Sequence, residues 1–528
     1  MCGFLVYLGQ DQGFKSQIPE HFELLKHRGP DHTGVVDFEA GMLCFHRLSI
    51  MDLTYHGNQP LFSVDDMLAL VCNGEIYNYE MLKQETPYEY KSHSDCEIIL
   101  PIYQKYGIET CLERIDGEFA FVLFDKIKGC FIAARDPIGI RPLFYGYNAA
   151  GEMLFASEMK ALHGLCQDIK AFPPGHYYDG ESIKEYCDLT KVETYLAKDE
   201  ESVLEGIKHH LTKAVEKRLH ADAPVGFLLS GGLDSSLVCS IAQRASKEPI
   251  RTFAIGMETD AIDLKYAKIV ADFLGTDHTE VIITNEDVFH ALEKTIWHLE
   301  TWDITTVRAS LGMFLLCKYI HENTDIKVLH TGEVSDELFG YKYTDFAPNA
   351  AEFQKESEKR IKELYMYDVL RADRCISAHS LEARVPFSDR DFVGFVMHID
   401  PEMKMNTYQM GKYLLRKSFE KGDYLPDSIL FRDKAAFSDA VGHSLVDELK
   451  SLAENKYTEQ DLKEAELKYQ HGTPHSKESL LYRDIFSSFY EGREGLVSGF
   501  WLPNQEWENC SVLDPSARFL PNYGKSGV

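Results

Sequence analysis

The sequence lacks the features that mark a zinc protein, a secreted protein or a membrane protein. Its twelve cysteines are scattered, with no CxxC pair and no cysteine–histidine cluster at metal-ligand spacing. No apolar run approaches the length of a membrane span. The N-terminus has no basic stretch and only a short apolar run, Phe4 to Leu8, so we expect no signal peptide. We therefore predict a cytoplasmic protein with free thiols and no membrane association.

An excess of positive charge is also lacking. The chain of 528 residues has a formal net charge of −29. An acidic surface repels phosphate backbones, so nucleic acid is not an expected partner. Apolar residues make up 44% of the chain, which is enough for two or more domains with cores of their own. We expect small molecules as partners, with a homodimer as the candidate assembly.

The chain does contain a glycine-rich turn, Ser230 to Ser236 (SGGLDSS), between an apolar run and a helix-compatible pattern. This order predicts backbone N–H groups that point at an anion, and adjacent glycines let the main chain approach a phosphate closely. The turn has no lysine, so it is not a Walker A loop. Asp234 suggests that Mg²⁺ joins the phosphates there. The alternative is an ordinary strand-to-helix turn capped by serine.

Cys2 carries a second candidate chemistry. A small residue after the initiator methionine normally allows Met1 to be removed, which would leave Cys2 with a free α-amine. That amine has an ordinary pKa near 8 and can accept the thiol proton, so nucleophile and base would belong to one residue. A cysteine at position 2 without such a role is the alternative, and the two residues alone favour it.

Seven motifs in the first third of the chain reverse that preference. Together they resemble the class II glutamine amidotransferase domain, in family order and with family spacing. This resemblance implies an N-terminal nucleophile fold, with two antiparallel sheets between helix layers. The motifs are MCG at 1–3, HRGPD at 27–31, RLSIMD at 47–52, NGEIYN at 73–78, SDCE at 94–97, DGEFAF at 116–121 and RDPIGIRPL at 135–143.

The resemblance implies a role for each matching residue. Cys2 would attack the side-chain amide of glutamine and release ammonia, with the Asn73 side chain and the Gly74 N–H stabilising the oxyanion. Glu75 and Asp95 would bind the substrate α-ammonium. The planar guanidinium of Arg47 suits the α-carboxylate. The implied glutamine-binding set is Arg47, Leu48, Ser49, Ile50, Met51, Asn73, Gly74, Glu75 and Asp95.

The rest of the chain predicts a second domain. We place the boundary near residue 195, giving domains 1–195 and 196–528. Beyond it, strands and helices alternate as in a doubly wound parallel α/β sheet, followed by a mostly helical C-terminal part. We expect residues after about Pro503 to be irregular and loosely attached. Ligands of such sheets bind beyond the carboxyl ends of strands, where Leu228, Ile255 and Thr331 are predicted.

An acidic segment, Thr331 to Gly340 (TGEVSDELFG), provides a partner for SGGLDSS. Its acidic side chains can be interpreted in two ways. They are either Mg²⁺ ligands with a catalytic base, or carboxylates at the solvated start of a helix. Its position at an adjacent strand end favours the first. This segment resembles a loop of the asparagine synthetase family in which glycine stands at the position of Val334. A β-branched residue such as valine is strained at positive φ. We therefore expect a negative φ at Val334.

SGGLDSS resembles the pyrophosphate loop of the ATP pyrophosphatases, and four further segments resemble the asparagine synthetase family. These are ETWDITTVRAS at 300–310, the acidic segment, LEARVPF at 381–387 and RDKAAFSD at 432–439. The resemblance implies ATP as a substrate, with Glu333 positioning or deprotonating ammonia and with Asp234 and Asp336 holding Mg²⁺. The implied ATP contacts are Leu228, Ser230, Gly231, Gly232, Asp234, Ser235, Ile255, Thr331, Gly332 and Lys434.

The combined motifs predict an ATP-dependent amide ligase that makes asparagine from aspartate and glutamine. Aspartate would be activated as β-aspartyl-AMP, with release of pyrophosphate, and ammonia from the Cys2 site would travel inside the protein. One alternative is an amidotransferase of the same architecture that acts on another carboxylate acceptor. A non-enzymatic relative is the other alternative, although Cys2, Asp234 and Glu333 are all present.

Overall fold

The computed structural model describes residues 1–196, 199–259, 261–432, 443–514 and 520–522. The chain forms two compact units, each made of separate stretches. Within the described residues, no helix combines the length and the apolar character needed to cross a membrane. The first unit contains Met1–Asp188, His220–Pro224 and Ser377–Glu382, and the second contains Leu189–Leu219, Val225–Ile376 and Ala383–Val528.

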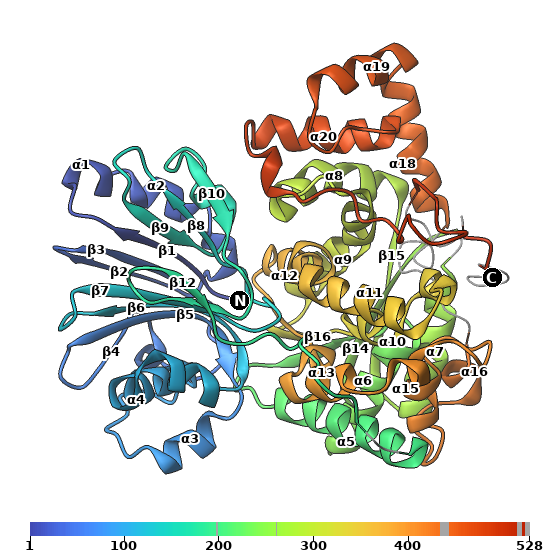
Figure 1. Cartoon of the computed structure of the whole chain (residues 1–528), viewed down its shortest axis with the longest axis horizontal. Helices are drawn as coiled ribbons and strands as arrows, with labels where there is room; N and C mark the ends of the chain where they lie inside the picture. The colour runs from blue at the N-terminus through green and yellow to red at the C-terminus, as the bar shows by residue number, and fades with distance from the viewer. Residues whose placement is uncertain (197–198, 260, 433–442, 515–519, 523–528) are drawn as a thin grey trace. The chain divides into compact units, whose positions relative to one another are not determined.

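The first unit is built on two antiparallel sheets, seen on the left of Figure 1. One has the strand order β10-β8-β9-β1-β3-β2 and the other β12-β11-β7-β6-β5-β4. The first sheet contains β1 (Gly3–Leu8), β2 (His32–Phe38), β3 (Gly41–Arg47), β8 (Phe144–Tyr147), β9 (Met153–Ala156) and β10 (Asp168–Ala171). The second contains β4 (Leu61–Phe62), β5 (Leu68–Ile76), β6 (Gly117–Asp125), β7 (Cys130–Arg135), β11 (His176–Tyr178) and β12 (Ile183–Glu185).

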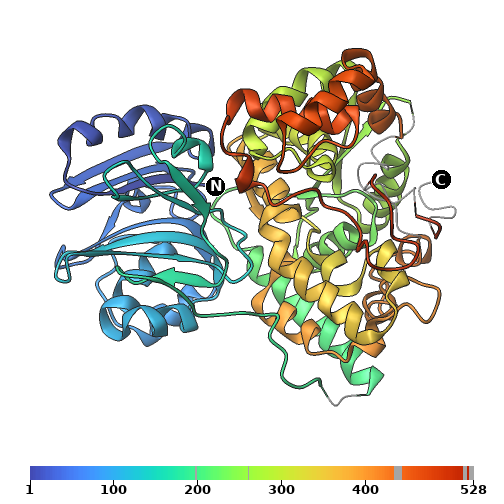
Figure 2. The same cartoon turned by 45° about the horizontal axis from the view of Figure 1, so that its top comes forward.

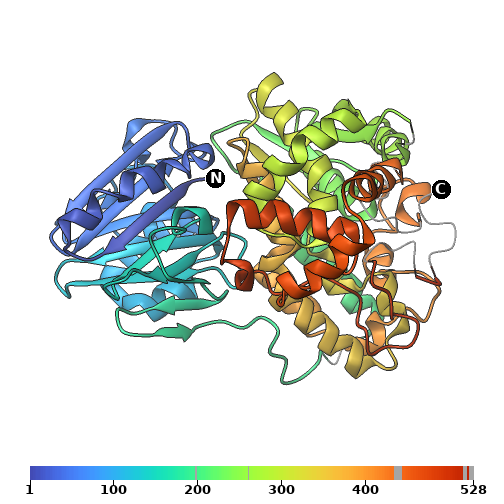
Figure 3. The ribbon, with the colours of Figure 1, turned by 90° about the horizontal axis from the view of Figure 1, so that it is seen from above.

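Apolar side chains from both sheets form the core of this unit. Alternation along β1 and β5 directs Phe4 and Val6 toward Ala69 and Val71, in one continuous buried cluster. The opposite face of the second sheet packs under α3 (Tyr79–Glu85) and α4 (Ile99–Arg114). Figures 2 and 3 show the helices outside the paired sheets, with α1 (Gln12–Lys15) and α2 (Ile18–Glu23) beside the first sheet. The predicted sandwich of two antiparallel sheets between helices is confirmed.

The second unit is built on a sheet with the order β15-β14-β13-β16-β17. The pairs β14·β15, β13·β14 and β13·β16 are parallel, which confirms the predicted parallel sheet. Strand β13 is largely apolar because both faces of a parallel sheet are covered by helices. The strands are β13 (Val225–Leu228), β14 (Arg251–Met257), β15 (Asp277–Ile283), β16 (Val328–His330) and β17 (Glu382–Arg384).

Helices surround this sheet and make up most of the remaining chain. Helix α6 begins within the glycine-rich turn, and α10 lies within the acidic segment at the neighbouring strand. The helices near the sheet are α5 (Glu200–Arg218), α6 (Leu233–Ala245), α7 (Ile262–Leu274), α8 (Asn285–Leu299), α9 (Ile304–Asn323), α10 (Ser335–Phe339), α11 (Ala350–Glu363), α12 (Asp368–Ser377) and α13 (Arg390–Met397). Toward the C-terminus lie α14 (Pro401–Lys404), α15 (Tyr413–Ser418), α16 (Asp427–Leu430), α18 (His443–Lys456), α19 (Glu459–Lys468) and α20 (Lys477–Phe489).

The segment around Arg47 corrects one local prediction. The alternation of residues 46–52 in the sequence predicts a strand that starts near Arg47, but β3 ends there and residues 48–52 form a loop. The Arg47 side chain explains the loop, because its terminal N–H groups bond to the carbonyl oxygens of Met51, Asp52 and Thr54. Those bonds stabilise a chain reversal in which Asp52 has a φ of +54°.

Asn73 and Gly74 correct a second prediction. The Asn-Gly dipeptide after an apolar run predicts a turn, but both residues lie within β5, opposite Ala120 and Phe119 of β6. A side chain at position 74 would place its Cβ 2.4 Å from the Glu118 carbonyl oxygen. Glycine is therefore needed for close strand contact at this position, rather than for a turn.

Two predictions about the C-terminal third are also wrong. The pattern of residues 377–387 was included in the predicted helical C-terminal part, but this stretch contains β17 and a short 3-10 turn at Pro386–Ser388. Residues after Pro503 were expected to be loosely attached. Trp507, Cys510 and Leu520 are instead buried in a cluster with Tyr343 and Phe353. These side chains attach residues 504–514 and 520–522, and none of these described residues belongs to a helix or a strand.

Candidate functional site

The thiol of Cys2 lies at the start of β1, beside the loop that follows β3. The Leu48 N–H donates to Sγ at 3.4 Å, and Sγ lies 3.6 Å from the Leu48 carbonyl oxygen. Cys2 also donates its backbone N–H to Oδ1 of Asn73 at 3.1 Å. The nucleophile candidate and the oxyanion candidate are therefore adjacent, although 71 residues separate them in sequence.

The side chain of Asn73 has an unusual combination of burial and hydrogen bonding. It is 1% exposed, and its Nδ2 has no hydrogen-bond partner among the described residues. Leaving a buried amide donor unpaired costs about 1–3 kcal/mol. Asn73 Oδ1 accepts the backbone N–H of Cys2, so the side chain that positions the nucleophile also carries the unpaired donor. Such a donor is suited to an oxyanion that forms only during reaction.

Burial controls the protonation of the thiol while Met1 is present. Burial raises the pKa of Cys2 to about 11, and the nearby amino terminus offsets part of this rise. Burial also lowers the pKa of the Met1 amino group to about 5, although Glu382 acts in the opposite direction. That amino group donates to the Leu381 carbonyl oxygen at 3.1 Å. With Met1 attached, the thiol is neutral at physiological pH and Cys2 has no free amine.

Arg28 holds the backbone of the nucleophile. Its Nε donates to the Cys2 carbonyl oxygen at 2.8 Å, and one terminal nitrogen pairs with Glu158 at 2.6 Å. The same nitrogen donates to Ser377 Oγ at 3.1 Å. Arg28 and Glu158 are both fully buried, so removing one would leave an uncompensated buried charge. The motif HRGPD therefore contributes a structural anchor for Cys2.

The predicted glutamine-binding residues line the same region of the first unit. Asp95 accepts the Ile76 N–H at 2.6 Å, which places this carboxylate at the end of β5 next to Glu75. Arg47 uses its terminal nitrogens on the loop that follows β3 and on Asn58 Oδ1, at 2.8 Å. The Ser49 N–H donates to Asp31 at 2.8 Å. Arg47, a predicted substrate contact, therefore also fixes the shape of the loop that follows β3.

In the second unit, the glycine-rich turn forms one wall of a cavity of about 590 Å³. Gly231 has a φ of +71°, and a Cβ there would lie 2.4 Å from the Ala267 backbone nitrogen. The Ser235 hydroxyl accepts the Ser230 N–H at 3.2 Å. Among the residues that the structure describes, no side chain caps the start of α6, so the N–H groups of its first turn face the cavity region.

The acidic segment forms the opposite wall. A Cβ on Gly332 would lie 2.7 Å from the Ser235 backbone nitrogen, so the two loops approach each other through glycine. Ser335 donates its hydroxyl to Asp234 at 2.7 Å, which joins the loops directly. Sequence-predicted residues that line the cavity are Leu228, Ser230, Gly232, Asp234, Ser235, Ile255, Thr331, Gly332, Glu333 and Asp336. Lys434 lies outside the described residues.

Val334 contradicts the expected backbone conformation. Its φ is +82° and its ψ is −18°, whereas we expected a negative φ. The chain must pass Ser235 at Gly332 and then enter α10 at Ser335, so the reversal falls on Val334. A β-branched residue in this region carries about 1–3 kcal/mol of strain, and the side chain is buried at 2% exposure.

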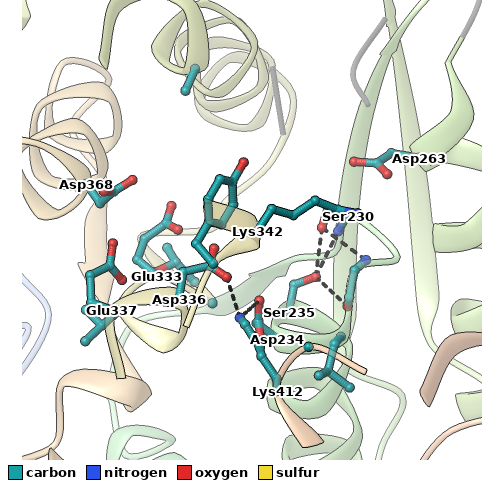
Figure 4. A pocket seen from close by; sticks show the side chains of 18 of the residues that line it. Ser230, Asp234, Ser235, Asp263, Glu333, Asp336, Glu337, Lys342, Asp368 and Lys412 are labelled. Carbon is teal, nitrogen blue, oxygen red and sulfur yellow. Dashed lines mark hydrogen bonds and ion pairs between the residues drawn. The ribbon is translucent and has the colours of Figure 1, made fainter. Parts of the chain in front are cut away.

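Charged side chains crowd the cavity (Figure 4). Arg371 lies 3.2 Å from Glu333 and 3.0 Å from Asp368. Burial raises the pKa of Glu337 well above its usual range, and the neighbouring charges of Asp368 and Asp336 raise it further. The raised pKa favours the protonated form of Glu337 and so reduces the negative charge beside Asp336 and Asp368.

Several residues of this cavity were not predicted from the sequence. Lys412 contacts both predicted metal ligands, Arg371 contacts Glu333, and Trp501 and Tyr341 line the cavity from the C-terminal segment and the loop after α10. No local signal distinguishes Lys412 from a surface lysine. Trp501 packs at 4.7 Å beneath the Arg360 guanidinium, an arrangement visible only after folding.

Carboxylates suited to a metal occur as a pair rather than as a cluster. Within the described residues, no group of three or more histidine, cysteine, aspartate or glutamate side chains is arranged to hold a metal ion. Asp234 and Asp336 nevertheless converge on one cation, the Lys412 ammonium, at 2.8 and 2.7 Å. The pair therefore fits a small cation whose remaining ligands come from phosphates.

Comparison with known proteins agrees with both candidate sites. A family model described as a glutamine amidotransferase domain matches residues 1–210, and one described as asparagine synthase matches residues 206–351 and 345–518. Asparagine synthetase [glutamine-hydrolyzing] 3 of Arabidopsis thaliana is 42% identical over 548 residues, covering 100% of this chain and 94% of the relative. The Zea mays asparagine synthetase [glutamine-hydrolyzing] is 39% identical, covering 100% and 94%. A probable asparagine synthetase of Dictyostelium discoideum is 40% identical, covering 98% of each chain.

Proposed function

The chain belongs to the glutamine-hydrolysing asparagine synthetase family, and on that premise we propose that it makes asparagine from aspartate, glutamine and ATP. The observation that carries the proposal is the cavity in which the glycine-rich turn meets the acidic segment. A phosphate-binding turn facing carboxylates is the arrangement that an adenylating enzyme needs. The Cys2 site supplies the complementary chemistry, because amide formation requires a source of ammonia.

At the first site, Cys2 attacks the side-chain carbonyl carbon of glutamine and forms a thioester, and ammonia leaves. The oxyanion of the tetrahedral intermediate accepts hydrogen bonds from the unpaired Nδ2 of Asn73 and from the Gly74 N–H. Removing one such donor typically costs about 2.7–4 kcal/mol of transition-state stabilisation. Water then hydrolyses the thioester to glutamate. Arg47, Glu75 and Asp95 are the proposed contacts for the α-groups of glutamine.

Removal of Met1 is part of this proposal. The thiol needs a base, and the pKa of about 11 in the chain that carries Met1 leaves it protonated near neutral pH. A free α-amine on Cys2 would accept the proton directly. Mass spectrometry of the purified N-terminus tests this step. A protein that hydrolyses glutamine with Met1 still attached would contradict it.

At the second site, the β-carboxylate of aspartate attacks the α-phosphorus of ATP and pyrophosphate leaves. The first turn of α6, with the hydroxyls of Ser230 and Ser235, binds the pyrophosphate. Apolar lining at Leu228 and Ile255 accommodates the adenosine. Asp234 and Asp336 would hold Mg²⁺, which would neutralise charge on the leaving pyrophosphate. Glu333 positions ammonia for attack on the acyl-adenylate.

Compartment and assembly are carried forward as parts of the proposal. All twelve cysteines are free thiols, which supports a reducing, cytoplasmic environment. A homodimer remains the proposed assembly. Its test is the mass of the purified protein in solution, measured by light scattering. A mass near the 60.3 kDa of one chain would contradict it.

Product analysis tests the proposed reaction. Purified enzyme is incubated with ATP, glutamine, magnesium and aspartate as the sole acceptor, and AMP and asparagine are quantified against time. We expect the two products in equal amounts, with neither formed when aspartate is omitted. Glutamine hydrolysis without aspartate-dependent AMP would instead favour an amidotransferase that uses another carboxylate acceptor.

A further inference from the structure

Lys412 stands between the two carboxylates of the second site. It follows Gly411 and precedes α15, with a φ of +59°, and its side chain is only 5% exposed. Nζ lies 2.8 Å from both carboxylate oxygens of Asp234 and 2.7 Å from Oδ1 of Asp336. Figure 4 shows the ammonium joined to both residues. Ser335 contributes its hydroxyl oxygen at 3.0 Å.

These contacts use all three N–H donors of the ammonium group. The donors hydrogen-bond to both carboxylate oxygens of Asp234 and to the Ser335 hydroxyl, and the contact with Asp336 Oδ1 is an ion pair. Distances of 2.7–2.8 Å are those of charge-assisted contacts. Without this cation, two carboxylates from different loops would repel each other, and the loops would separate or one carboxylate would take up a proton.

The same oxygens are those that a divalent cation would use. Mg²⁺ binds oxygen ligands at about 2.0–2.1 Å and is typically held by one or two carboxylates together with substrate phosphates. A divalent cation and the ammonium cannot share Asp234 and Asp336, because both are positive and both need the same lone pairs. Occupation of the pair by one therefore excludes the other.

We propose that Lys412 is a built-in counter-ion, which holds Asp234 and Asp336 together in the nucleotide-free enzyme and gives them up when a divalent cation arrives with the nucleotide. Phosphate oxygens in the cavity offer the displaced ammonium new partners. Lys412 acts through the two carboxylates, so it is a positioning residue. This inference rests on the proposed function in one respect, which is that the phosphates in the cavity belong to ATP.

This exchange couples metal binding to nucleotide binding. A divalent cation alone must expel the ammonium into a cavity in which Glu333 and Asp368 already pair with Arg371, so its affinity is low. Removing the Lys412 charge turns the carboxylate pair into a standing cation site. We expect the affinity for a divalent cation alone to rise at least about tenfold, within the usual range of coupling between sites.

Manganese binding without nucleotide tests the inference. The full-length wild type, Lys412→Met and Lys417→Met are titrated with Mn²⁺, and free Mn²⁺ is followed by electron paramagnetic resonance. Lys417 is a matched control, because it lies in α15, which begins directly after Lys412, and pairs with Glu420 away from the carboxylate pair. We expect Lys412→Met to bind one Mn²⁺ at least about tenfold more tightly than the other two proteins.

A second substitution locates the added site. Asp234→Asn in the Lys412→Met background is expected to remove the additional Mn²⁺ binding. Equal Mn²⁺ affinity in the wild type and Lys412→Met would overturn the inference, as would added binding that survives Asp234→Asn. If Lys412→Met does not fold, Lys412→Gln replaces it with the same expected result. Because no aspartate or ATP is present, this outcome is independent of whether aspartate is the acceptor.

Discussion

The two sites of this chain are held in place by different kinds of structure. The Cys2 site depends on strand register, since β5 carries Asn73 and Gly74 and pairs along its length with β6. The cavity of the second unit lies between two loops, which are joined by the charges of Asp234, Asp336 and Lys412. A site on strands is positioned before substrate binds. A site between charged loops depends on the ions present.

Burial reinforces this difference. The Asn73 side chain is 1% exposed and keeps an unpaired donor, so its free-energy cost is met by the surrounding sheet packing. Asp336 has a side-chain exposure of 27%, and its charge is balanced locally by Lys412. We therefore expect substitutions at the first site to change catalysis while leaving the architecture intact. Substitutions at the second should also change how ions and nucleotide bind.

Separating the two activities should give the largest effect. Cys2→Ala removes the nucleophile, so glutamine-dependent asparagine synthesis is expected to fall at least about a thousandfold. Synthesis from added ammonium salt should stay close to the wild-type rate, because the second site is untouched. The measurement is asparagine formation with each nitrogen source at saturating ATP.

The reciprocal variant is Asp234→Asn, which should stop AMP formation while glutamine hydrolysis survives. Equal loss of glutamine-dependent and ammonia-dependent synthesis in Cys2→Ala would break the comparison, since the two sites would then fail as one. Unchanged AMP output in Asp234→Asn would show that this carboxylate has no part in the proposed adenylation.

The unpaired donor of Asn73 gives the next prediction. Asn73→Ala removes Nδ2 and should lower kcat for glutamine hydrolysis by about 10²–10³, with a smaller change in KM. Asn78→Ala is the matched control, since Asn78 uses its amide on Arg114 and Asp116 in the same unit. Should KM rise while kcat is retained, Asn73 would be a binding residue rather than an oxyanion donor.

The pKa of Cys2 predicts how N-terminal processing changes reactivity. A pKa of about 11 exceeds the ordinary value of about 8.5, so at pH 8 the thiolate fraction in the form with Met1 is over about a hundredfold lower. Below its pKa a thiol is neutral, so alkylation by iodoacetamide should accelerate up to about pH 11. The rate is read from mass spectra of the Cys2 peptide. A rate that levels off below pH 9 would contradict the raised pKa.

The sequence predicted local structure well where pattern and pairing coincide. The run RTFAIGM predicts a strand over residues 251–257, and β14 has these bounds because every residue of the run pairs with β15. Asn73 and Gly74 were misread as a turn because their dipeptide favours turns in isolation, while β6 pairs across them. Local propensity was overridden by a tertiary partner that the sequence pattern does not reveal.

The residues of the second site divide in the same way. Asp234 and Asp336 were predicted as partners because each follows a strand of one sheet. Lys412 was missed, because it reaches the pair from a segment 178 residues away from Asp234. Long-range charge pairing leaves no periodicity in the sequence. The positive φ of Val334 was missed for a related reason, since the demand comes from the close approach of Gly332 to Ser235.

Strain at Val334 gives the smallest expected effect. Val334→Gly removes the cost of a β-branched residue at positive φ, about 1–3 kcal/mol, but loses the burial of a valine side chain, about 1.5–3 kcal/mol. Val328→Gly, in β16, loses similar burial with no such relief, since Val328 is fully buried in a strand. We therefore expect Val334→Gly to lower the free energy of unfolding by at least about 1 kcal/mol less than Val328→Gly does. Urea titration of both variants measures the difference. Equal losses would mean that the loop stores no strain at Val334, and the second site would then depend on charge alone.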